Sequence, residues 1–355
     1  MQGTMKKVVI TGERQAALVD MPIPRPVADW ALVKMTVVPM CTEYKAWLRG
    51  PSPGNDRIDA LGHEGAGVVV EVAQPCGVEV GDRVVLMGAG PCGRCAYCRA
   101  GYFLQCPYPS RGAHVPGRAA ERGVPEPTGA YAQYRLGAAW LLPKIPDDLS
   151  DEHAAMAWCG LGPTFGAMQS ANVGAFDTVL ITGAGPVGQG GIVNGKYRGA
   201  RVIVAELEPW RAERARLLGA DVVVNPRDED VLDQIRALTD DGLGVTCAID
   251  CAGVTASQRL CIDAARPHGK VVFVAESSTP LPITVSPDMI RKSLTLIGQW
   301  HYSLNDWDQM MQLVRDAGDK LDILISHRFP MSRVQDALAL SATHECGKIL
   351  LDPWN

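Results

Sequence analysis

The stretch Thr178-Val-Leu-Ile-Thr182-Gly-Ala-Gly185-Pro-Val-Gly188 decides the fold of this chain. An apolar, β-prone run passes directly into three glycines spaced as G-x-G-x-x-G, and a helical stretch follows. In that context glycine permits a tight turn and lets the backbone approach a pyrophosphate, while the helix N-terminus offers free N–H donors. An ordinary strand-to-helix turn is the alternative. The candidate cofactor residues are Gly183, Gly185, Pro186, Val187 and Gly188.

A second β-prone run, residues 201–205, ends in the acid Glu206. A carboxylate at this distance from the glycines would accept hydrogen bonds from ribose hydroxyls. It would also repel a 2′-phosphate, so the sequence predicts NAD rather than NADP. Arg211 lies nearby and either serves a phosphate or is a solvated side chain. Cys251 and Ala252, after a later strand, either form the next wall of the cofactor site or simply end that strand.

The order of strand-like and helical runs predicts two bodies. Up to about residue 149, short β-prone runs punctuated by Gly and Pro indicate an irregular all-β body. From about residue 151, helices and strands alternate, which is typical of a parallel sheet wrapped by helices. The expected strands are 7–10, 30–38, 67–72, 83–87, 131–135, 178–182, 201–205, 221–224, 245–250, 270–274 and 347–352. The expected helices are 151–156, 164–171, 211–218, 231–238, 256–265 and 306–316.

Composition excludes several classes of protein. The chain has 355 residues, a formal net charge of −5 and both signs of charge interspersed. This pattern gives no basic stripe for nucleic acid, and no run of 18 apolar residues suggests a membrane span. Residues 1–12 contain lysines but no apolar core of signal-peptide length, so we expect a cytoplasmic protein. Most cysteines outside the cluster described next are expected to be packing residues.

A short segment contains four cysteines in the pattern C-x2-C-x2-C-x7-C, namely Cys92, Cys95, Cys98 and Cys106. This spacing lets four thiolates surround one tetrahedral zinc ion, with Zn–S distances near ~2.3 Å. Because no coordination position remains open, the site is predicted to hold a loop in place rather than to do chemistry. Two disulfides, or an iron–sulfur cluster on the same ligands, are the alternatives.

Together these motifs resemble the zinc-dependent medium-chain alcohol and polyol dehydrogenases over almost the whole chain. Further motifs that carry the resemblance are Gly62-His63-Glu64-Gly-Ala-Gly67, Gly81-Asp82-Arg83-Val84, Gly129-Ala-Tyr-Ala-Gln-Tyr134 and Gly347-Lys348. The resemblance implies an α/β protein, with a GroES-like β-rich catalytic domain and a Rossmann domain with a doubly wound parallel sheet. The implied boundaries are 1–154 (with a zinc lobe at about 90–107), 155–297, and a return to the catalytic domain over 298–355.

The resemblance also implies a second, catalytic zinc. Its protein ligands would be Cys41, His63 and Cys159, with Glu64 beside the metal and able to ligate it when substrate is absent. Three N/S ligands and one open position are typical of a catalytic zinc. Each residue also has a plainer interpretation, as a buried thiol or a core histidine.

One position departs from the family pattern. After the first ligand the family has a small residue, then Ser or Thr, then Asp, whereas this chain reads Cys41-Thr42-Glu43-Tyr44. Either Glu43 replaces the hydroxyl that passes the substrate proton to solvent and acts as a base or an extra ligand, or the loop is shifted by one residue. In the second case Thr42 and Glu43 stand in for the hydroxyl and the acid. The sequence leaves both open.

The function implied is interconversion of a secondary alcohol and its ketone by hydride transfer to NAD. We expect a polyol, cyclitol or amino-sugar alcohol as the substrate. The alternatives are a simple alcohol or aldehyde dehydrogenase, a zinc-independent quinone or enone reductase, and a catalytically idle NAD-binding homologue.

Clues to the substrate and to assembly are weaker. Trp47, Trp158 and Trp300 either stack on a sugar ring or are core and contact residues. Arg111, Arg118 and Arg122, in a loop-like segment, either attract an anion or form a solvated face. Residues 293–300 resemble the edge strand through which family members join their sheets, so we expect a homodimer or homotetramer.

Overall fold

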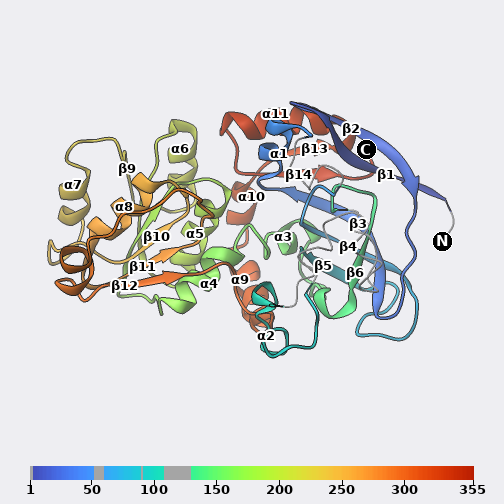
Figure 1. Cartoon of the computed structure of the whole chain (residues 1–355), viewed down its shortest axis with the longest axis horizontal. Coiled ribbons are helices and arrows are strands. Elements are labelled where there is room, and N and C mark those ends of the chain that lie inside the picture. Colours follow the sequence, from blue (N-terminus) through green and yellow to red (C-terminus); the bar gives the residue numbers. More distant parts are fainter. Residues whose placement is uncertain (1–2, 52–59, 89–90, 108–128) are drawn as a thin grey trace.

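The structure, a computed structural model, describes residues 3–51, 60–88, 91–107 and 129–355. The molecule consists of two lobes that lie side by side, and both chain ends belong to the same lobe (Figure 1). The loop expected to contain Arg111, Arg118 and Arg122 lies outside the described residues.

The lobe with the chain ends is built around a mixed sheet of strand order β13-β14-β3-β4-β5, in which β6 also pairs with β3. Strand β3 is buried along almost its whole length because β14, β4 and β6 flank it. The late strand β14 pairs with the early strand β3, so the chain returns to its first body. The bounds are β1 (Thr4–Gly12), β2 (Gln15–Pro22), β3 (Trp30–Met40), β4 (Glu64–Val72), β5 (Arg83–Met87), β6 (Tyr134–Ala138), β13 (Ile325–Pro330) and β14 (Lys348–Asp352).

Helices in and beside this lobe are mostly short. They are α1 (Glu43–Arg49), α2 (Ala96–Arg99), α3 (Asp151–Ala155), α9 (Trp307–Ala317), α10 (Lys320–Leu324) and α11 (Val334–Thr343). Helices α3, α9 and α10 lie between the two lobes (Figure 1). Buried residues of both lobes join one continuous hydrophobic cluster, which includes Leu161 and Met310. The lobes are therefore packed against each other through an apolar contact.

The other lobe contains a six-stranded parallel sheet of order β12-β11-β10-β7-β8-β9. Its strands are β7 (Thr178–Thr182), β8 (Arg201–Ala205), β9 (Val222–Val224), β10 (Val245–Asp250), β11 (Ala265–Phe273) and β12 (Thr295–Gly298). Its helices are α4 (Gly162–Ser170), α5 (Pro186–Tyr197), α6 (Pro209–Leu217), α7 (Val231–Ala237) and α8 (Thr255–Ala264). The strand order reverses between β7 and β10, and ligands bind outside the carboxyl ends of strands at such a switch point.

The parallel sheet and the glycine turn were predicted closely. Strands β5, β7, β8 and β10 have the expected bounds. Strand β12 lies within residues 293–300, where an edge strand was expected. No element was predicted at β2, α1, β13 or α11, which are short or only weakly amphipathic. Several boundaries were wrong, and at two of them the structure shows the physical reason. Strand β6 begins at Tyr134, because Tyr131 is a fully buried turn residue, and β11 begins at Ala265, where the helix was expected to continue.

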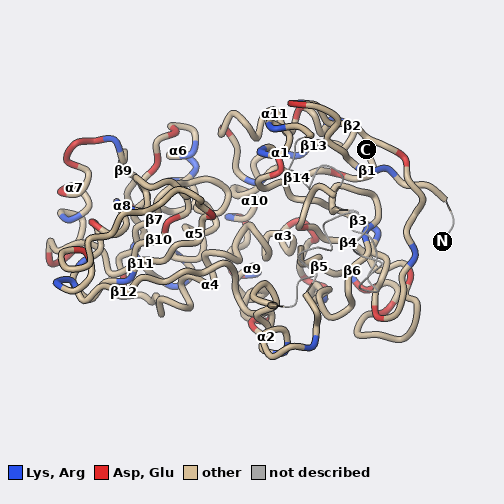
Figure 2. Tube along the Cα trace, viewed as in Figure 1, with Lys and Arg blue, Asp and Glu red and all other residues tan. Residues whose placement is uncertain are grey.

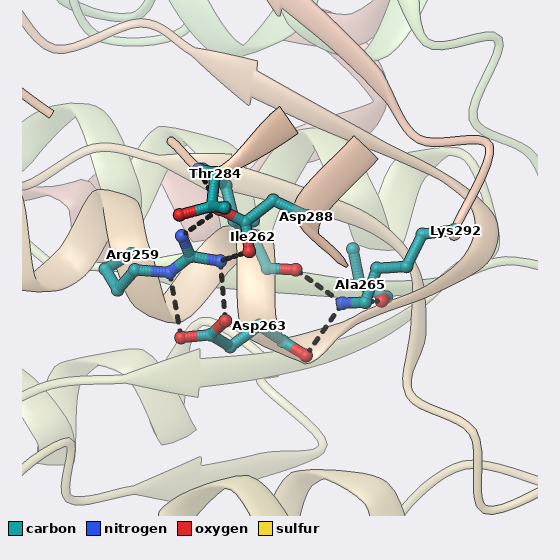
Figure 3. Close-up of polar contacts among 7 residues, drawn as sticks. All are labelled: Arg259, Ile262, Asp263, Ala265, Thr284, Asp288 and Lys292. Atoms are coloured by element: carbon teal, nitrogen blue, oxygen red, sulfur yellow. Dashed lines mark hydrogen bonds and ion pairs between the residues drawn. The ribbon is translucent and has the colours of Figure 1, made fainter. Parts of the chain in front are cut away.

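Strand β12 forms one edge of the parallel sheet, and a polar network holds the segment before it (Figure 3). The Nζ of Lys292 donates to the carbonyls of Ile262, Asp263 and Ala265 at 2.7, 3.2 and 2.8 Å, so it satisfies the open C-terminal carbonyls of α8. The guanidinium of Arg259 binds the carboxylates of Asp263 and Asp288 at 2.6 and 2.9 Å. These contacts hold Asp288 and Lys292, and therefore the segment that leads into β12.

The charges of both signs are spread along the described part of the chain, without a continuous basic strip (Figure 2). Among the described residues, no helix is both long enough and apolar enough to cross a membrane.

Candidate metal and nucleotide sites

The four cysteines of the C-x2-C-x2-C-x7-C pattern meet in one lobe around α2. Their sulfur atoms all lie within 4.8 Å of one another. The Sγ–Sγ separations are 3.5 Å for Cys95 and Cys98, 3.8 Å for Cys95 and Cys106, and 3.9 Å for Cys92 and Cys98. A tetrahedral ion with Zn–S bonds of ~2.3 Å requires edges of roughly 3.8 Å. The residues therefore fit a zinc ion, and all four are free rather than paired in disulfides.

The segment that contains the four cysteines contacts the rest of the molecule at two places. The carbonyl of Gly101 accepts from the backbone N–H of Leu304 at 3.1 Å, and the hydroxyl of Ser303 donates to the carbonyl of Ala100 at 3.0 Å. Phe103, between the third and fourth cysteines, stacks on Trp158 with ring centroids 5.6 Å apart. Trp158 directly precedes Cys159, so the lobe supports the loop that carries this thiol.

A second group joins residues from distant parts of the chain: Cys41, His63, Glu64 and Cys159. One donor atom from each lies within 4.8 Å of the others. The Nε2 atom of His63 is 3.1 Å from the sulfur of Cys159. Two thiols, an imidazole nitrogen and a carboxylate form a donor set that zinc prefers. The structure thus brings together all four residues that the resemblance implied.

Glu43 lies behind this group rather than in it. Its Oε1 is 2.7 Å from Nδ1 of His63, while Oε2 accepts from the Cys41 backbone N–H at 2.8 Å and from the Tyr131 hydroxyl at 3.0 Å. Burial alone would raise the pKa of Glu43, but His63 and the backbone N–H of Cys41 lower it to about 2. The carboxylate is thus ionised and accepts a hydrogen bond from Nδ1 of His63, so Nε2 is the ring nitrogen that points toward the metal-ligand group.

Both oxygens of Glu43 are occupied by protein donors, which argues against its being an extra ligand. The geometry instead matches the shifted-loop interpretation for the acid, since a carboxylate that binds the outer nitrogen of a ligating histidine fixes the ring and its tautomer. Thr42, which precedes it, is exposed and begins α1 without a side-chain capping bond.

We expect Glu43→Gln to weaken zinc binding at the second group by about 10- to 100-fold, because the amide can orient His63 but no longer supplies the negative charge. Competition with a chromophoric chelator measures the affinity. Glu229→Gln, at an exposed position on the other lobe, is the matched control. Equal affinities in the two variants would show that Glu43 does not support the ligand.

Glu64 is held by a buried cation. Its Oε1 accepts from Nζ of Lys348 at 2.5 Å, and both side chains are 0% exposed. Its other oxygen, Oε2, has no hydrogen-bond partner among the described residues. Burial raises the pKa of Glu64, and Lys348 opposes this shift. One oxygen is thus fixed by an ion pair while the other remains available beside the thiols.

The glycine turn has the geometry that the sequence predicted. Gly183 has φ +85°, and a Cβ at Gly188 would lie 1.8 Å from the carbonyl oxygen of Gly183. Both glycines are therefore required for the turn to close. Pro186 and Val187 are the first two residues of α5, and Gly185 is its N-cap. Cys251 and Ala252 lie directly against the turn, within 3.5 Å of the positions where added Cβ atoms would stand.

Glu206 directly follows β8, and its carboxylate hydrogen-bonds to the backbone of the glycine turn. Its Oε2 accepts from the N–H of Ala184 at 2.5 Å, and Oε1 accepts from the N–H groups of Leu207 and Glu208 at 2.7 and 2.9 Å. A carboxylate has about four acceptor positions, so room for a ribose hydroxyl remains. The guanidinium of Arg211 lies beside Gly185, with Nη1 3.6 Å from where a Cβ would stand.

Helix α5 connects the nucleotide turn with the metal-ligand group. A Cβ at Gly190 would lie 1.8 Å from the carbonyl oxygen of Gly160, so glycine is needed for α5 to approach the loop after Cys159. The buried Nδ2 of Asn194 donates to the carbonyl of Leu161 at 3.0 Å and to the hydroxyl of Thr164 at 2.9 Å. The helix that begins at the turn therefore also positions Cys159.

Several residues at the site were not found from the sequence. Tyr131, Lys348 and His301 are buried next to the candidate ligands, and only the family motifs around the first two pointed to them. Trp47 is a core residue whose Nε1 donates to Gln335, so it is not a stacking surface for a sugar. Trp158 is buried, whereas Trp300 is 40% exposed. Cys247, Cys261 and Cys346 are buried packing residues as expected, and Cys76 is half-buried.

Comparison with protein families defines the class of this chain. Residues 27–147 match the alcohol dehydrogenase GroES-like domain, and residues 186–316 match the zinc-binding dehydrogenase domain. The chain is 30% identical to the L-threonine 3-dehydrogenase of Pyrococcus abyssi over 350 residues, which cover 94% of each protein. It therefore belongs to the zinc-dependent medium-chain alcohol/polyol dehydrogenase family, and the expected GroES-like and Rossmann architecture is confirmed.

Two further proteins are similar to this chain over almost their whole length. The sorbitol dehydrogenase of Bacillus subtilis is 29% identical over 358 residues, which cover 98% of this chain and 97% of the relative. A crystal structure of an alcohol dehydrogenase (rspB) from Escherichia coli CFT073, complexed with cofactor NADH, superposes with a TM-score of 0.84. It is 26% identical, with 98% of this chain and 99% of that chain covered.

Proposed function

We propose that this protein interconverts a secondary alcohol and its ketone with NAD, and that the alcohol is a polyol or a related cyclic or amino-sugar alcohol. One observation carries the proposal. The group of Cys41, His63, Glu64 and Cys159 has the donors of a catalytic zinc, and α5 connects it directly to a dinucleotide-type glycine turn. Relatives that include a sorbitol dehydrogenase support the polyol class.

In this mechanism Cys41, His63 and Cys159 would hold the metal and would leave one coordination position open for substrate. When bound, zinc supplies a Lewis acid for the substrate oxygen and the nicotinamide supplies a two-electron acceptor. Glu43 keeps the proton on Nδ1 of His63, so Nε2 remains a ligand. Lys348 holds one oxygen of Glu64 and leaves the other beside the open position. Thr42 is our candidate for proton transfer to solvent.

The cofactor preference is proposed from Glu206. Its carboxylate is fixed beside the glycine turn by three backbone N–H groups. A dianionic 2′-phosphate at this place would be repelled, whereas a ribose hydroxyl can donate to the remaining lone pair. Arg211 beside Gly185 offers a cation to the phosphates that both cofactors share. We therefore propose NAD rather than NADP.

The alternatives are less well supported. A zinc-independent quinone or enone reductase would not need two groups with zinc-type donors. A catalytically idle homologue was suggested by the chance that Glu43 blocks the metal, but both oxygens of Glu43 bind protein donors instead. A simple alcohol dehydrogenase remains the closest alternative, since it would use the same ligands.

The test combines metal content with turnover. We expect close to two zinc ions per chain in protein purified without added metal, and NADH formation with polyols when the protein is assayed against polyols, cyclitols and simple alcohols. NADPH formation should be much slower. One zinc per chain, or no turnover of any alcohol by the two-zinc protein, would refute the proposal.

A cytoplasmic homodimer or homotetramer is proposed as the working form. The expected contact segment, residues 293–300, contains β12, which is an edge strand of the parallel sheet and pairs with β11 on one side. Edge strands offer backbone hydrogen-bonding groups to a partner.

A further inference from the structure

The first turn of α6 contacts the other lobe through an aromatic side chain. Trp210, on α6, and His327, on β13, have nearly parallel rings, with centroids 6.3 Å apart and planes 21° apart. Helix α6 belongs to the lobe with the parallel sheet, whereas β13 is an edge strand of the mixed sheet in the other lobe (Figure 1). The contact therefore crosses the boundary between the two lobes.

The stacking continues beyond these two rings on both sides. The rings of His327 and Phe329 have centroids 6.5 Å apart and planes 29° apart. The guanidinium of Arg214 lies 4.9 Å from the ring centroid of Trp210, and that of Arg333 lies 5.6 Å from the ring centroid of Phe329. We call these five residues, Trp210, Arg214, His327, Phe329 and Arg333, the interlobe stack.

The interlobe stack is strong enough to bias an equilibrium but too weak to be permanent. One aromatic pair changes an equilibrium constant by about 2- to 10-fold beyond the effect of its buried area. The three rings are half-buried, so they lie at the boundary between the lobes and not in a core. A contact of this kind can open and close while both lobes stay folded.

The imidazole of His327 is suited to its place in the stack. Burial lowers the pKa of His327, and the charge of Arg214 lowers it further. The ring is therefore neutral at pH 7 and is not repelled by the guanidinium. Its Nδ1 is 2.9 Å from Oγ of Ser326, and that oxygen accepts from the N–H of Gly347 at 2.9 Å. These bonds fix the ring to β13 and to the residue before β14.

The same turn of α6 borders the nucleotide site. Glu208, the N-cap of α6, donates its N–H to the carboxylate of Glu206 at 2.9 Å. Next to Trp210, Arg211 also contacts the other lobe. Burial raises the pKa of the Cys346 thiol, and Arg211, which hydrogen-bonds to it, lowers this pKa. One helical turn thus holds the proposed ribose-binding carboxylate on one side and the second lobe on the other.

We propose that the interlobe stack is a latch that holds the two lobes together over the bound cofactor and slows the release of NADH. This inference rests on the proposed function, because it takes NAD as the cofactor. Trp210 and His327 act through α6 and are positioning residues. When the latch opens, the turn that holds Glu206 moves away from the other lobe, and the cofactor can leave.

The test measures NADH release directly, on zinc-loaded protein without an alcohol. Excess NAD displaces bound NADH, and stopped-flow fluorescence follows the loss. Trp210→Ala and His327→Ala should each raise the dissociation rate constant by about 3- to 10-fold. The association rate constant should change by less than about two-fold, because the latch closes after the encounter. Trp210→Phe keeps an aromatic ring and should recover most of the wild-type behaviour.

The double variant shows whether the two rings act together. Because both alanine substitutions remove the same contact, Trp210→Ala with His327→Ala should release NADH no faster than either single variant. Phe176→Ala is the matched control, since it removes a fully exposed ring from the same lobe. It should leave both rate constants unchanged.

A second measurement needs no cofactor. Hydrogen exchange of the cofactor-free protein should be several-fold faster in Trp210→Ala than in the wild type for the amides of β13 and of the first turn of α6. The amides of β7 and β10, in the centre of the parallel sheet, should exchange as in the wild type. This pattern separates an opened latch from a general loss of stability.

The outcomes distinguish this inference from the proposed function. If the wild-type protein binds no NADH, the proposed function fails, and hydrogen exchange alone decides the latch, which unchanged exchange overturns. If NADH binds and the alanine variants release it at the wild-type rate, the function stands and the latch is overturned. Effects that multiply in the double variant would also overturn it, because Trp210 and His327 would then act separately.

Discussion

Replacing Cys159 by alanine is expected to lower turnover by at least about a thousandfold and to leave one zinc ion per chain instead of two. This result is expected because the thiol is one of three protein ligands in the open metal group, and Lewis-acid stabilisation of the substrate oxygen contributes several kcal/mol. A loss of about 4 kcal/mol in transition-state stabilisation corresponds to a thousandfold in rate. NADH formation and metal analysis provide the two measurements.

The control for this substitution is Cys76→Ala, which removes a half-buried thiol outside both cysteine-containing metal groups. It should retain two zinc ions and full turnover. His63→Ala should behave like Cys159→Ala, and both variants should still bind NADH, because the glycine turn lies on separate residues. Normal turnover in both ligand variants would refute the assignment of the catalytic metal.

Replacement of Lys348 by methionine is expected to lower the free energy of unfolding by about 3–5 kcal/mol. The residue is fully buried, and its ammonium group pairs with the equally buried carboxylate of Glu64. Removing one member of a buried ion pair leaves the other charge uncompensated in a low-dielectric interior, which costs far more than the pair contributes. Urea denaturation of the zinc-loaded protein measures the change.

A second variant tests whether the loss of stability comes from the broken ion pair or from altered packing. The double substitution Lys348→Met with Glu64→Gln should recover most of the lost stability, because no unpaired charge remains. Lys320→Met, at an exposed position, should change stability by less than about 0.5 kcal/mol. If the double variant is as unstable as the single one, the loss arises from altered packing.

The nucleotide turn and the cysteine lobe could be predicted because each is encoded within a few consecutive residues. The run from Thr178 to Gly188 contains both the strand and the glycines that it needs, and the spacing of Cys92, Cys95, Cys98 and Cys106 already limits how their sulfurs can meet. Strands buried on both faces, such as β7 and β10, are also visible as continuous apolar runs. Elements such as β2 and α11 were missed because their sequences lack such a run or motif.

The role of Glu43 could not be decided in this way. Along the chain it stands two residues after Cys41, and both a metal ligand and a supporting acid fit that position. Its direction depends on His63 and Tyr131, which lie 20 and 88 residues away in sequence. Only after the strands have packed do these groups present a nitrogen and a hydroxyl to the carboxylate.

By itself, the sequence determined the two-body architecture and the four-cysteine cluster, because these follow from local motifs and their spacing. The candidate ligands Cys41, His63 and Cys159 came from the resemblance of those motifs to a known family. The tertiary structure alone decided which groups support those ligands. Lys348 binds Glu64, which lies 284 positions earlier in the sequence. His301 follows the last strand of the parallel sheet, yet it stacks on Trp158, which precedes the first. Such contacts depend on how two lobes pack, and side-chain burial and pairing are properties of that packing rather than of any local pattern.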